Sequence, residues 1–419
     1  MSDLTTENKS IPSQVFSLPV LVAALGYMVD MYDLFLFSIV RVTSLKALGL
    51  NESQLLEDGI FLLNLQMAGL LVGGIVWGII GDKKGRLSVL FGSILIYSLA
   101  NIGNGFVTTL DQYAVLRFIA GFGLAGELGA GITLVAEILP KAIRGYGTTL
   151  VATMGVMGAI LAYLITYLFD WRLSYFIGGG LGVVLLILRI SVFESGMFEK
   201  LKVRNIKRGN LVMLFGNKVR LTKYLNSILI GLPIWFVTGI LITFSPEFGK
   251  ALGLAEPVDA GKAVMFFFTG QVAGDIISGF ISQYLKSRKK VILLFIVSSF
   301  FFVVLYLLFP TQNLTTFYIL CSCLGVCNGY WTLFVTVAAE LFGTNLRATV
   351  ATSAPNFVRG ATIPLTALFI LGKNNIGVAY GTLAVAVLAY GIALLALRFL
   401  EETYSKDLDY TEEDLSRKT

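Results

Sequence analysis

Two carboxylates stand inside the first long apolar segment of the sequence. Asp30 and Asp33 lie in the run 26–37, in which most other residues are hydrophobic. A charge near the centre of a lipid bilayer costs roughly 2.5–3.5 kcal/mol on insertion scales, so such a residue usually has a functional reason. Positions three apart share one face of a helix, which places the two side chains one turn apart and pointing the same way.

The composition is that of an integral membrane protein. Of the 419 residues, 56% are hydrophobic and only 14% are charged, whereas globular domains carry about 25% charged residues. The mean hydropathy is +0.80. Twelve spanning helices of about 20 residues each would account for about 240 residues. The 44 glycines fit this class, because small residues let membrane helices pack closely.

Several kinds of chemistry are excluded by the residues that the sequence lacks. It contains no histidine, which removes imidazole metal sites, Ser-His and Cys-His catalysis, and histidine proton relays. Any proton carrier must therefore be a carboxylate. The three cysteines, Cys321, Cys323 and Cys327, fall in one apolar segment, where a metal site would need more ligands and an aqueous approach. We expect small packing residues there, with no disulfide, metal or cofactor.

The apolar segments predict twelve membrane spans. The first is expected to be a retained helix and not a signal peptide, since no small-residue cleavage site follows it. Basic residues are concentrated on one side: one alternate set of loops holds 18 Lys and Arg, the other six. The positive-inside rule makes the first set cytoplasmic, with both termini inside and the chain in the plasma (inner) membrane. The predicted spans are 16–41, 58–81, 87–107, 111–138, 145–169, 173–193, 222–246, 262–285, 290–309, 315–341, 348–371 and 375–398.

The two halves repeat each other around a basic linker. After the fourth span, Arg144 follows Glu137 by seven residues, and after the tenth, Arg347 follows Glu340 by the same spacing, at an offset of 203. Six helices per unit make the repeat parallel. The net charge of +6 is mostly topological, so no nucleic-acid partner is expected. The expected domains are 1–193 (six-helix bundle), 194–221 (cytoplasmic linker), 222–399 (six-helix bundle) and 400–419 (cytoplasmic tail).

These loops resemble signatures of the major facilitator superfamily of secondary transporters. Gly78, Asp82, Gly85 and Arg86 match its loop between helices two and three, and residues 117–126 match its fourth-helix signature. The Glu/Arg pairs are similar to those of the sugar-porter and metabolite–proton symporter branches. The first helix is most like the metabolite–proton and aromatic acid–proton symporters, which carry an acidic residue followed three positions later by the Asp of a Tyr-Asp pair.

The resemblance implies an all-α membrane fold of twelve transmembrane helices in two six-helix bundles, related by a parallel pseudo-two-fold repeat. It also implies that the charged loop residues latch the cytoplasmic face in the outward-open state, the alternative being a solvated basic loop. Residues 121–126 also spell a dinucleotide fingerprint, but no strand precedes them and they lie within an apolar span, so helix packing is expected. The expected cytoplasmic gate is Asp82, Gly85, Arg86, Glu127, Glu137, Arg144, Glu340 and Arg347.

Depth within the bilayer suggests a partner for the two aspartates. At a rise of 1.5 Å per residue, Asp30 lies about 21 Å and Asp33 about 26 Å above the cytoplasmic boundary. Arg117 on the fourth span reaches about 21 Å in a core about 30 Å thick. Span ends are uncertain by about one turn, so either aspartate could face Arg117. Since two nearby carboxylates do not both ionise cheaply, these three residues are the predicted proton-coupling site; a static ion pair is the alternative.

A second buried cation suggests an anion site. Arg359 lies about 16 Å into the eleventh span, near mid-membrane, where transporter substrates bind. Its guanidinium suits a carboxylate, although a structural role beside Asp275 or a backbone carbonyl is the alternative. Other polar and aromatic side chains are expected to line the cavity, or else to bond between helices. The predicted substrate-binding residues are Arg359, Tyr32, Gln66, Trp235, Gln271, Asn328, Trp331 and Asn356.

The sequence thus predicts a proton-coupled symporter of a small metabolite, an organic acid or carboxylate, that works by alternating access. A zwitterion, sugar or polyol symporter and an efflux carrier are alternatives within the same class. A non-transporting receptor on the same scaffold is an alternative from another class. An enzyme is not expected, because no histidine and no polar domain large enough for a soluble active site are present. The expected partners are a small-molecule substrate, protons and the lipid bilayer, with the protein monomeric.

Overall fold

The computed structural model describes residues 14–84, 86–140, 143–194, 214–309, 313–404. These residues form helices and connecting turns, with no strand among them. Eleven helices are long and apolar enough to cross a membrane, and a shorter apolar helix covers Ser88–Asn104. The predicted all-α membrane architecture is therefore confirmed.

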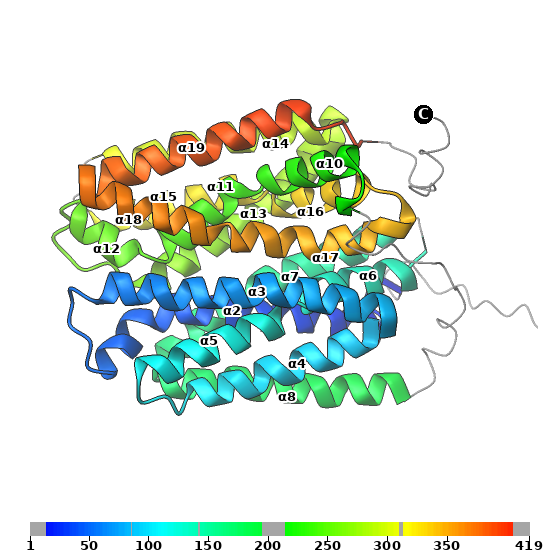
Figure 1. The fold of residues 1–419 in the computed structure, drawn as a ribbon, viewed down its shortest axis with the longest axis horizontal. Helices are drawn as coiled ribbons and strands as arrows, with labels where there is room; N and C mark the ends of the chain where they lie inside the picture. Colours follow the sequence, from blue (N-terminus) through cyan, green and yellow to red (C-terminus); the bar gives the residue numbers. More distant parts are fainter. Residues whose placement is uncertain (1–13, 85, 141–142, 195–213, 310–312, 405–419) are drawn as a thin grey trace, which may run out of the picture.

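The helices form two halves that stack one above the other in Figure 1, with the N-terminal half below. The N-terminal bundle consists of α2 (Leu18–Ala47), α3 (Leu55–Lys84), α4 (Arg86–Asn104), α5 (Leu110–Leu124), α6 (Glu127–Ile138), α7 (Arg144–Leu168) and α8 (Trp171–Glu194). The C-terminal bundle consists of α10 (Lys218–Leu229), α11 (Leu232–Phe236), the π-helix η2 (Val237–Ile242), α12 (Ser245–Ala251), α13 (Ala260–Leu285), α14 (Arg288–Leu308), α15 (Leu314–Asn328), α16 (Trp331–Glu340), α17 (Thr344–Gly360), α18 (Thr362–Ile376) and α19 (Val378–Phe399).

Two ends of the molecule are distinguished by their helices. We call the end that carries α12 and residues 48–54 the α12 end; it lies at the left of Figure 1. The opposite end, where α10 and α14 begin, is called the α10 end. Helix α10 begins at Lys218, inside the segment that the sequence assigned to the linker.

Several membrane passes, the spans of the sequence analysis, are broken into shorter helices, and two of these breaks occur at equivalent positions of the internal repeat. The fourth pass is interrupted between α5 and α6 at Gly126, and the tenth between α15 and α16 at Gly329. These glycines are separated by the same 203 residues as the Glu/Arg pairs. Backbone groups freed within a membrane must find partners inside the protein. Asn356 of α17 supplies one, since its Nδ2 donates to the Ala125 carbonyl at 2.9 Å.

The seventh pass is the least regular, running through α10, α11 and η2. Side chains from neighbouring helices donate to its carbonyls: Tyr330 to Ile230 at 3.0 Å and Asn328 to Ile234 at 3.0 Å. Tyr306 donates to the Leu241 carbonyl at 3.1 Å. The Tyr306 bond reaches the π-helical segment itself. This helical form is rare overall, and where it occurs it is often at a functional site.

Glycines let the central helices approach closely. A Cβ on Gly121 of α5 would lie 2.1 Å from the Gln66 carbonyl oxygen of α3, and one on Gly325 of α15 would lie 1.9 Å from the Phe267 carbonyl oxygen of α13. Either side chain would force two helices apart. The contact confirms that the glycine-rich run 121–126 serves helix packing.

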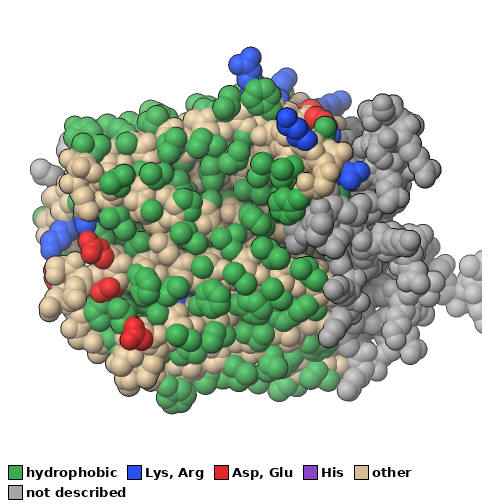
Figure 2. Space-filling view, in the orientation of Figure 1, with side chains coloured by type: hydrophobic (Ala, Val, Ile, Leu, Met, Phe, Trp, Pro, Cys, Tyr) green, Lys and Arg blue, Asp and Glu red, His purple; other side chains and the backbone are tan. Residues whose placement is uncertain are grey.

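The polarity of the molecule is that of a protein surrounded by lipid. Hydrophobic side chains cover the length of the view in Figure 2, while charged ones gather towards its two ends. Large apolar residues such as Phe280 and Phe301 are mainly exposed, at 74% and 58%. The fully buried side chains instead include Arg41, Arg117, Arg189 and Arg359.

Candidate functional site

Helix α2 carries both aspartates into the interior of the molecule. Asp30 and Asp33 have no exposed surface. By distance and angle, none of their four carboxyl oxygens has a hydrogen-bond partner among the described residues, although the Asn101 side chain of α4 lies near enough to act on the Asp33 carboxyl. Buried polar groups without partners are rare and call for an explanation. These carboxyls are therefore the leading candidates for protonation or ligand binding.

Asp33 faces Arg117, but the two side chains do not form an ion pair. They interact electrostatically, while the Arg117 Nη1 donates to the Tyr175 hydroxyl of α8 at 3.5 Å. The guanidinium carbon also lies 4.8 Å from the centroid of the Phe37 ring. The Nε and Nη2 of Arg117 have no partner among the described residues.

Asp30 faces a different arginine. The charged groups that act on it are Arg359 of α17 and Glu127 of α6. The two aspartates, one turn apart on α2, thus interact with different arginines: Asp33 with Arg117, and Asp30 with Arg359. The predicted depths in the bilayer placed Asp30 level with Arg117 and kept Asp33 as a possible partner. The structure favours Asp33 as the partner of Arg117.

Arg359 lies between two tryptophans at the boundary of the two bundles. Its guanidinium carbon is 5.8 Å from the ring centroids of both Trp235 and Trp331. Its Nη1 donates to Oδ1 of Asn356 at 3.4 Å, whereas its Nε and Nη2 have no partner among the described residues. Trp331 Nε1 donates across the boundary to the Tyr27 hydroxyl of α2 at 3.3 Å.

This arrangement could bind a planar anion. Guanidinium donors bind carboxylates in a two-bond geometry, and flat indole rings offer large apolar surfaces for a ring or conjugated chain. Asp275, considered as a partner for Arg359, instead accepts from the amide and the hydroxyl of Thr332, at 3.2 and 2.9 Å.

The other predicted lining residues differ in their surroundings. Trp235, Trp331 and Asn356 gather around Arg359, and Trp235 also stacks on Phe35 with centroids 6.1 Å apart. Tyr32 and Asn328 are engaged in helix packing, donating to the carbonyls of Ser174 and Ile234. Gln66 and Gln271 are buried, and both polar atoms of the Gln66 side chain lack partners among the described residues.

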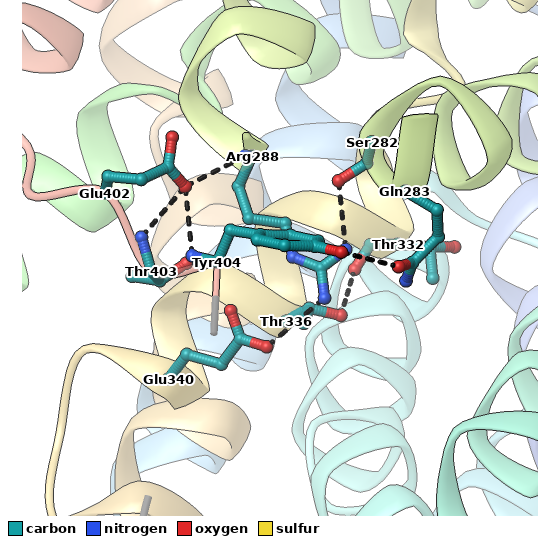
Figure 3. A network of polar contacts seen from close by, with 9 residues as sticks. All are labelled: Ser282, Gln283, Arg288, Thr332, Thr336, Glu340, Glu402, Thr403 and Tyr404. Atoms are coloured by element: carbon teal, nitrogen blue, oxygen red, sulfur yellow. Dashed lines mark hydrogen bonds and ion pairs between the residues drawn. The ribbon is translucent and has the colours of Figure 1, made fainter. Parts of the chain in front are cut away.

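Two of the expected gate residues have defined partners. Glu340 accepts from Arg288 Nη2 at 3.4 Å at the α10 end (Figure 3). Glu127 forms a two-bond ion pair with Arg189 of α8, one bond at 3.0 Å, inside the N-terminal bundle. The gate role of both residues stays a prediction. The side chains of Asp82, Arg86, Glu137, Arg144 and Arg347, together with Gly85, lie outside the part of the chain that the structure describes.

The segment after α19 joins the same network as Glu340. Figure 3 shows Glu402 at the start of α14, where its carboxylate accepts from the amides of Arg288 and Lys289 at 2.9 and 3.3 Å. The Ser287 hydroxyl also donates to it. Partial burial acts to raise the pKa of Glu402, but these bonds, with one from the Tyr404 amide, hold it below its ordinary value.

The sequence analysis missed a contact between the bundles at the α12 end. Arg41 of α2, fully buried, forms a 2.6 Å ion pair with Glu247 of α12. Ser38 and Thr243 lie 3.1 Å apart one turn deeper. The signal was present in the sequence, because Arg41 is the last residue of the predicted first span, 16–41, and a charge at that place calls for a partner. An ion pair at this place can hold the two bundles together at one end.

A weaker contact accompanies this pair on the surface. Glu52, next to α3, lies 3.3 Å from Lys250 of α12 and 3.3 Å from Lys46 of α2. Their hydrogen bonds and charges lower the pKa of Glu52 from its ordinary value. Exposed pairs of this kind contribute little to stability.

Comparison with known proteins places this architecture in a family. The sequence profile described as the Major Facilitator Superfamily matches residues 23–365. The chain belongs to this family. It is a multi-pass membrane transporter and not an enzyme, and the predicted family is confirmed.

Curated relatives are transporters of small molecules. The chain is 26% identical over 397 residues to the probable 4-methylmuconolactone transporter of Cupriavidus pinatubonensis, covering 90% of this chain and 89% of the relative. It is 25% identical to the gentisate transporter of Corynebacterium glutamicum, covering 96% and 93%. It is 30% identical over 198 residues to the niacin transporter NiaP of Acinetobacter baylyi, where it covers less than half the length of that relative, 44%, and 46% of this chain.

Solved structures share the fold. The xylose transporter XylE from E. coli, in an inward-open conformation, superposes with a TM-score of 0.70 at 16% sequence identity. The match covers 96% of this chain and 99% of that one. At this identity the likeness concerns the fold alone.

Proposed function

We propose that this protein is a proton-coupled symporter of a small organic carboxylate. The observation that carries the proposal is Arg359, a buried guanidinium between two tryptophans, with two donor groups that have no partner among the described residues. A buried cation whose donor groups lack hydrogen-bond partners is expensive. A substrate carboxylate would supply the missing partner, and the two indole rings would contact its apolar part.

The names of the relatives favour the same substrate class. Gentisate and niacin are aromatic carboxylic acids, and 4-methylmuconolactone is a cyclic lactone that carries a carboxymethyl group. Asp30, beside Arg359, adds a carboxyl that must be protonated, or meet a positive group, when an anion binds there. A substrate with both charges, a zwitterion, is therefore the competing possibility at the same site.

Proton coupling is assigned to Asp30, Asp33 and Arg117. The sequence holds no histidine, so a carboxylate must carry the proton. Asp33 and Arg117 are both fully buried and interact electrostatically without an ion pair. Loss of the Asp33 charge would free the Arg117 guanidinium to change partners. Such a change biases an equilibrium between two conformations.

The contacts between the bundles fit alternating access. Arg41 and Glu247 close the boundary at the α12 end. Towards the α10 end, Asn356 of α17 donates to the Ala125 carbonyl, so the C-terminal bundle rests on the break between α5 and α6. Contacts between the bundles on both sides of the central site are what an occluded state requires. In the proposed orientation the protein spans the inner membrane of the cell, with the α10 end and both termini on the cytoplasmic side. One chain is proposed to be the transporting unit.

The test is uptake into proteoliposomes that hold the purified protein, with radiolabelled gentisate and niacin as probes and D-xylose and proline as comparison solutes. An imposed inward pH gradient should drive accumulation of a carboxylate probe by the wild type. Asp33→Asn should abolish this accumulation while retaining exchange of labelled for unlabelled probe at equal pH, because exchange needs no net proton movement. Accumulation by both Asp33→Asn and Asp30→Asn under a pH gradient alone would refute the coupling site.

A further inference from the structure

The Arg117 guanidinium is held by groups other than Asp33. The phenol oxygen of Tyr175 accepts from its Nη1 at 3.5 Å, and the face of the Phe37 ring lies 4.8 Å from its central carbon. All three side chains are buried. The guanidinium therefore has an uncharged acceptor on one side and an aromatic face on another, an arrangement that stabilises a cation without an anion.

A third side chain fixes the position of this acceptor and this ring. The Tyr113 hydroxyl lies 2.6 Å from the Tyr175 hydroxyl and 3.3 Å from that of Ser44. The Tyr113 ring also packs edge-on against Phe37, with centroids 5.7 Å apart at 84°. Its contact with the Tyr175 ring is likewise edge-on, at 6.1 Å and 87°. Tyr113 thus holds both contacts of the guanidinium in place.

Asp33 offers the alternative partner, about one helical turn away. A Cβ on Gly178 of α8 would lie 2.5 Å from Asp33 Oδ1, so the carboxyl lies against α8 at that position. Tyr175 and Gly178 are three residues apart and share one face of α8. Two acceptors therefore lie along one turn of α8, which rises about 5.4 Å: the phenol of Tyr175 and, against Gly178, the carboxyl of Asp33 from α2.

We propose that Tyr175 and Phe37 form a resting place for the Arg117 guanidinium, which it occupies when Asp33 is protonated and leaves for Asp33 when that carboxyl is ionised. The inference rests on the proposed proton coupling and deepens it by naming the second partner. Arginine cannot give up its charge inside a protein, so protonation of Asp33 would strand a buried cation. The phenol oxygen and the ring face stabilise that cation, which makes the protonated state accessible. Tyr175 and Phe37 are positioning residues, since they act through Arg117.

Other titratable groups on α2, α4, α5 and α8 surround this cluster. Asp30 and Tyr32 precede Asp33 on α2, and both interact electrostatically with it, as does Tyr97 of α4. Tyr113 on α5 and Tyr175 on α8 complete the set. Only Asp30 among them adds a second carboxyl, so its signal must be separated from that of Asp33 in any titration.

The experiment is an infrared titration of the purified full-length protein in lipid nanodiscs, without substrate. It follows the carbonyl stretch of protonated carboxyls as a function of pH, and the bands are assigned with Asp33→Asn and Asp30→Asn. Tyr175→Phe removes the acceptor and so destabilises the protonated state relative to the ion pair. The Asp33 midpoint should fall, because protonation then needs about tenfold more protons, a shift of about one pH unit. Phe37→Leu should shift it in the same direction.

Tyr390→Phe is the matched control, since it removes a buried phenol that bonds Ser299 in the other bundle and should leave the midpoint unchanged. A midpoint that stays at the wild-type value in Tyr175→Phe and Phe37→Leu would overturn the inference. If Tyr175→Phe does not fold, the Phe37→Leu titration decides alone. Should Asp33→Asn remove no titrating band, then the coupling role of Asp33 itself is wrong, which is a separate outcome.

Discussion

Arg359 is the side chain on which the proposed carboxylate site depends. Lysine keeps the positive charge but lacks the planar fork that bonds both carboxylate oxygens. Because hydrogen bonds to charged groups contribute about 1.5–3 kcal/mol, we expect Arg359→Lys to raise the KM for carboxylate uptake about 10- to 100-fold. The measurement is initial uptake into proteoliposomes over a range of substrate concentrations.

Arg172→Lys serves as the control for this substitution. Arg172 also lies on a tryptophan, Trp171, but it stands at the start of α8 and bonds the Gly105 carbonyl at the α12 end, away from the proposed site. Its KM should match the wild type. An unchanged KM in Arg359→Lys would argue against two-bond recognition of the substrate and for a packing role.

Single residues were the easiest features to find from the sequence and the hardest to pair. Asp30, Asp33, Arg117 and Arg359 are conspicuous because a charge within an apolar span is costly. Their partners depend on depth and on rotation about the helix axis. An error of one turn in the end of a span exchanges Asp30 for Asp33, and this is why the sequence matched Arg117 with the other aspartate.

At the scale of elements, the sequence located the spans but not their interruptions. The fourth pass, predicted as one helix, breaks at Gly126, and the seventh contains the π-helical segment Val237–Ile242. A break leaves carbonyls without helical partners, and it persists only where another element supplies donors. Asn328 and Asn356 supply them from distant positions, and no local pattern reveals such long-range contacts.

The segment after α19 gives a prediction about an element end. Glu402 caps α14 by accepting from the amides of Arg288 and Lys289 and from the Ser287 hydroxyl. It also accepts from the two amides that follow it in its own segment. A negative charge at a helix N-terminus contributes about 0.3–1 kcal/mol, reduced here by solvent screening. Glu402→Gln should therefore lower the melting temperature of the purified protein by a small amount at pH 7, and Glu401→Gln, one residue earlier, is the comparison variant.

The dependence of this effect on pH follows from the sign of the shift. The pKa of Glu402 is lowered in the folded protein. Its contribution is therefore fully present above the ordinary glutamate value of about 4.3 and is lost as the pH falls through the lower folded value. The difference in melting temperature between wild type and Glu402→Gln should shrink at acid pH. A difference that grows on acidification would contradict the capping role.

At the scale of the whole molecule, the repeat was readable while the interface between the halves was not. Glu137 and Glu340 share a spacing that reveals two related bundles. The pairing of Arg41 with Glu247 joins residues 206 positions apart, and nothing in either sequence neighbourhood points to the other. Such contacts depend on which side of the transporter is closed, a property of the assembled bundles.

That contact leads to a prediction about the equilibrium between conformations. Arg41 is fully buried and also bonds the Leu55 carbonyl at 2.9 Å, so the N-terminal bundle holds it rigidly towards α12. Glu247→Gln removes the negative charge that pairs with Arg41. Because a hydrogen bond between charged groups contributes about 1.5–3 kcal/mol, the population open at the α12 end should rise by about tenfold or more.

The opening can be followed by electron–electron distance measurements between spin labels at Thr108→Cys and Ala255→Cys, two exposed positions on opposite bundles at the α12 end, with the native cysteines replaced by alanine. Glu247→Gln should move the distance distribution to longer values, whereas Glu256→Gln, an exposed carboxylate on the same face, should not. Because Arg41 remains buried in the variant, solvent must reach it for the cation to be satisfied. The conformation that opens the α12 end is the one that admits this water, so an unchanged distribution would mean that the pair does not control the opening.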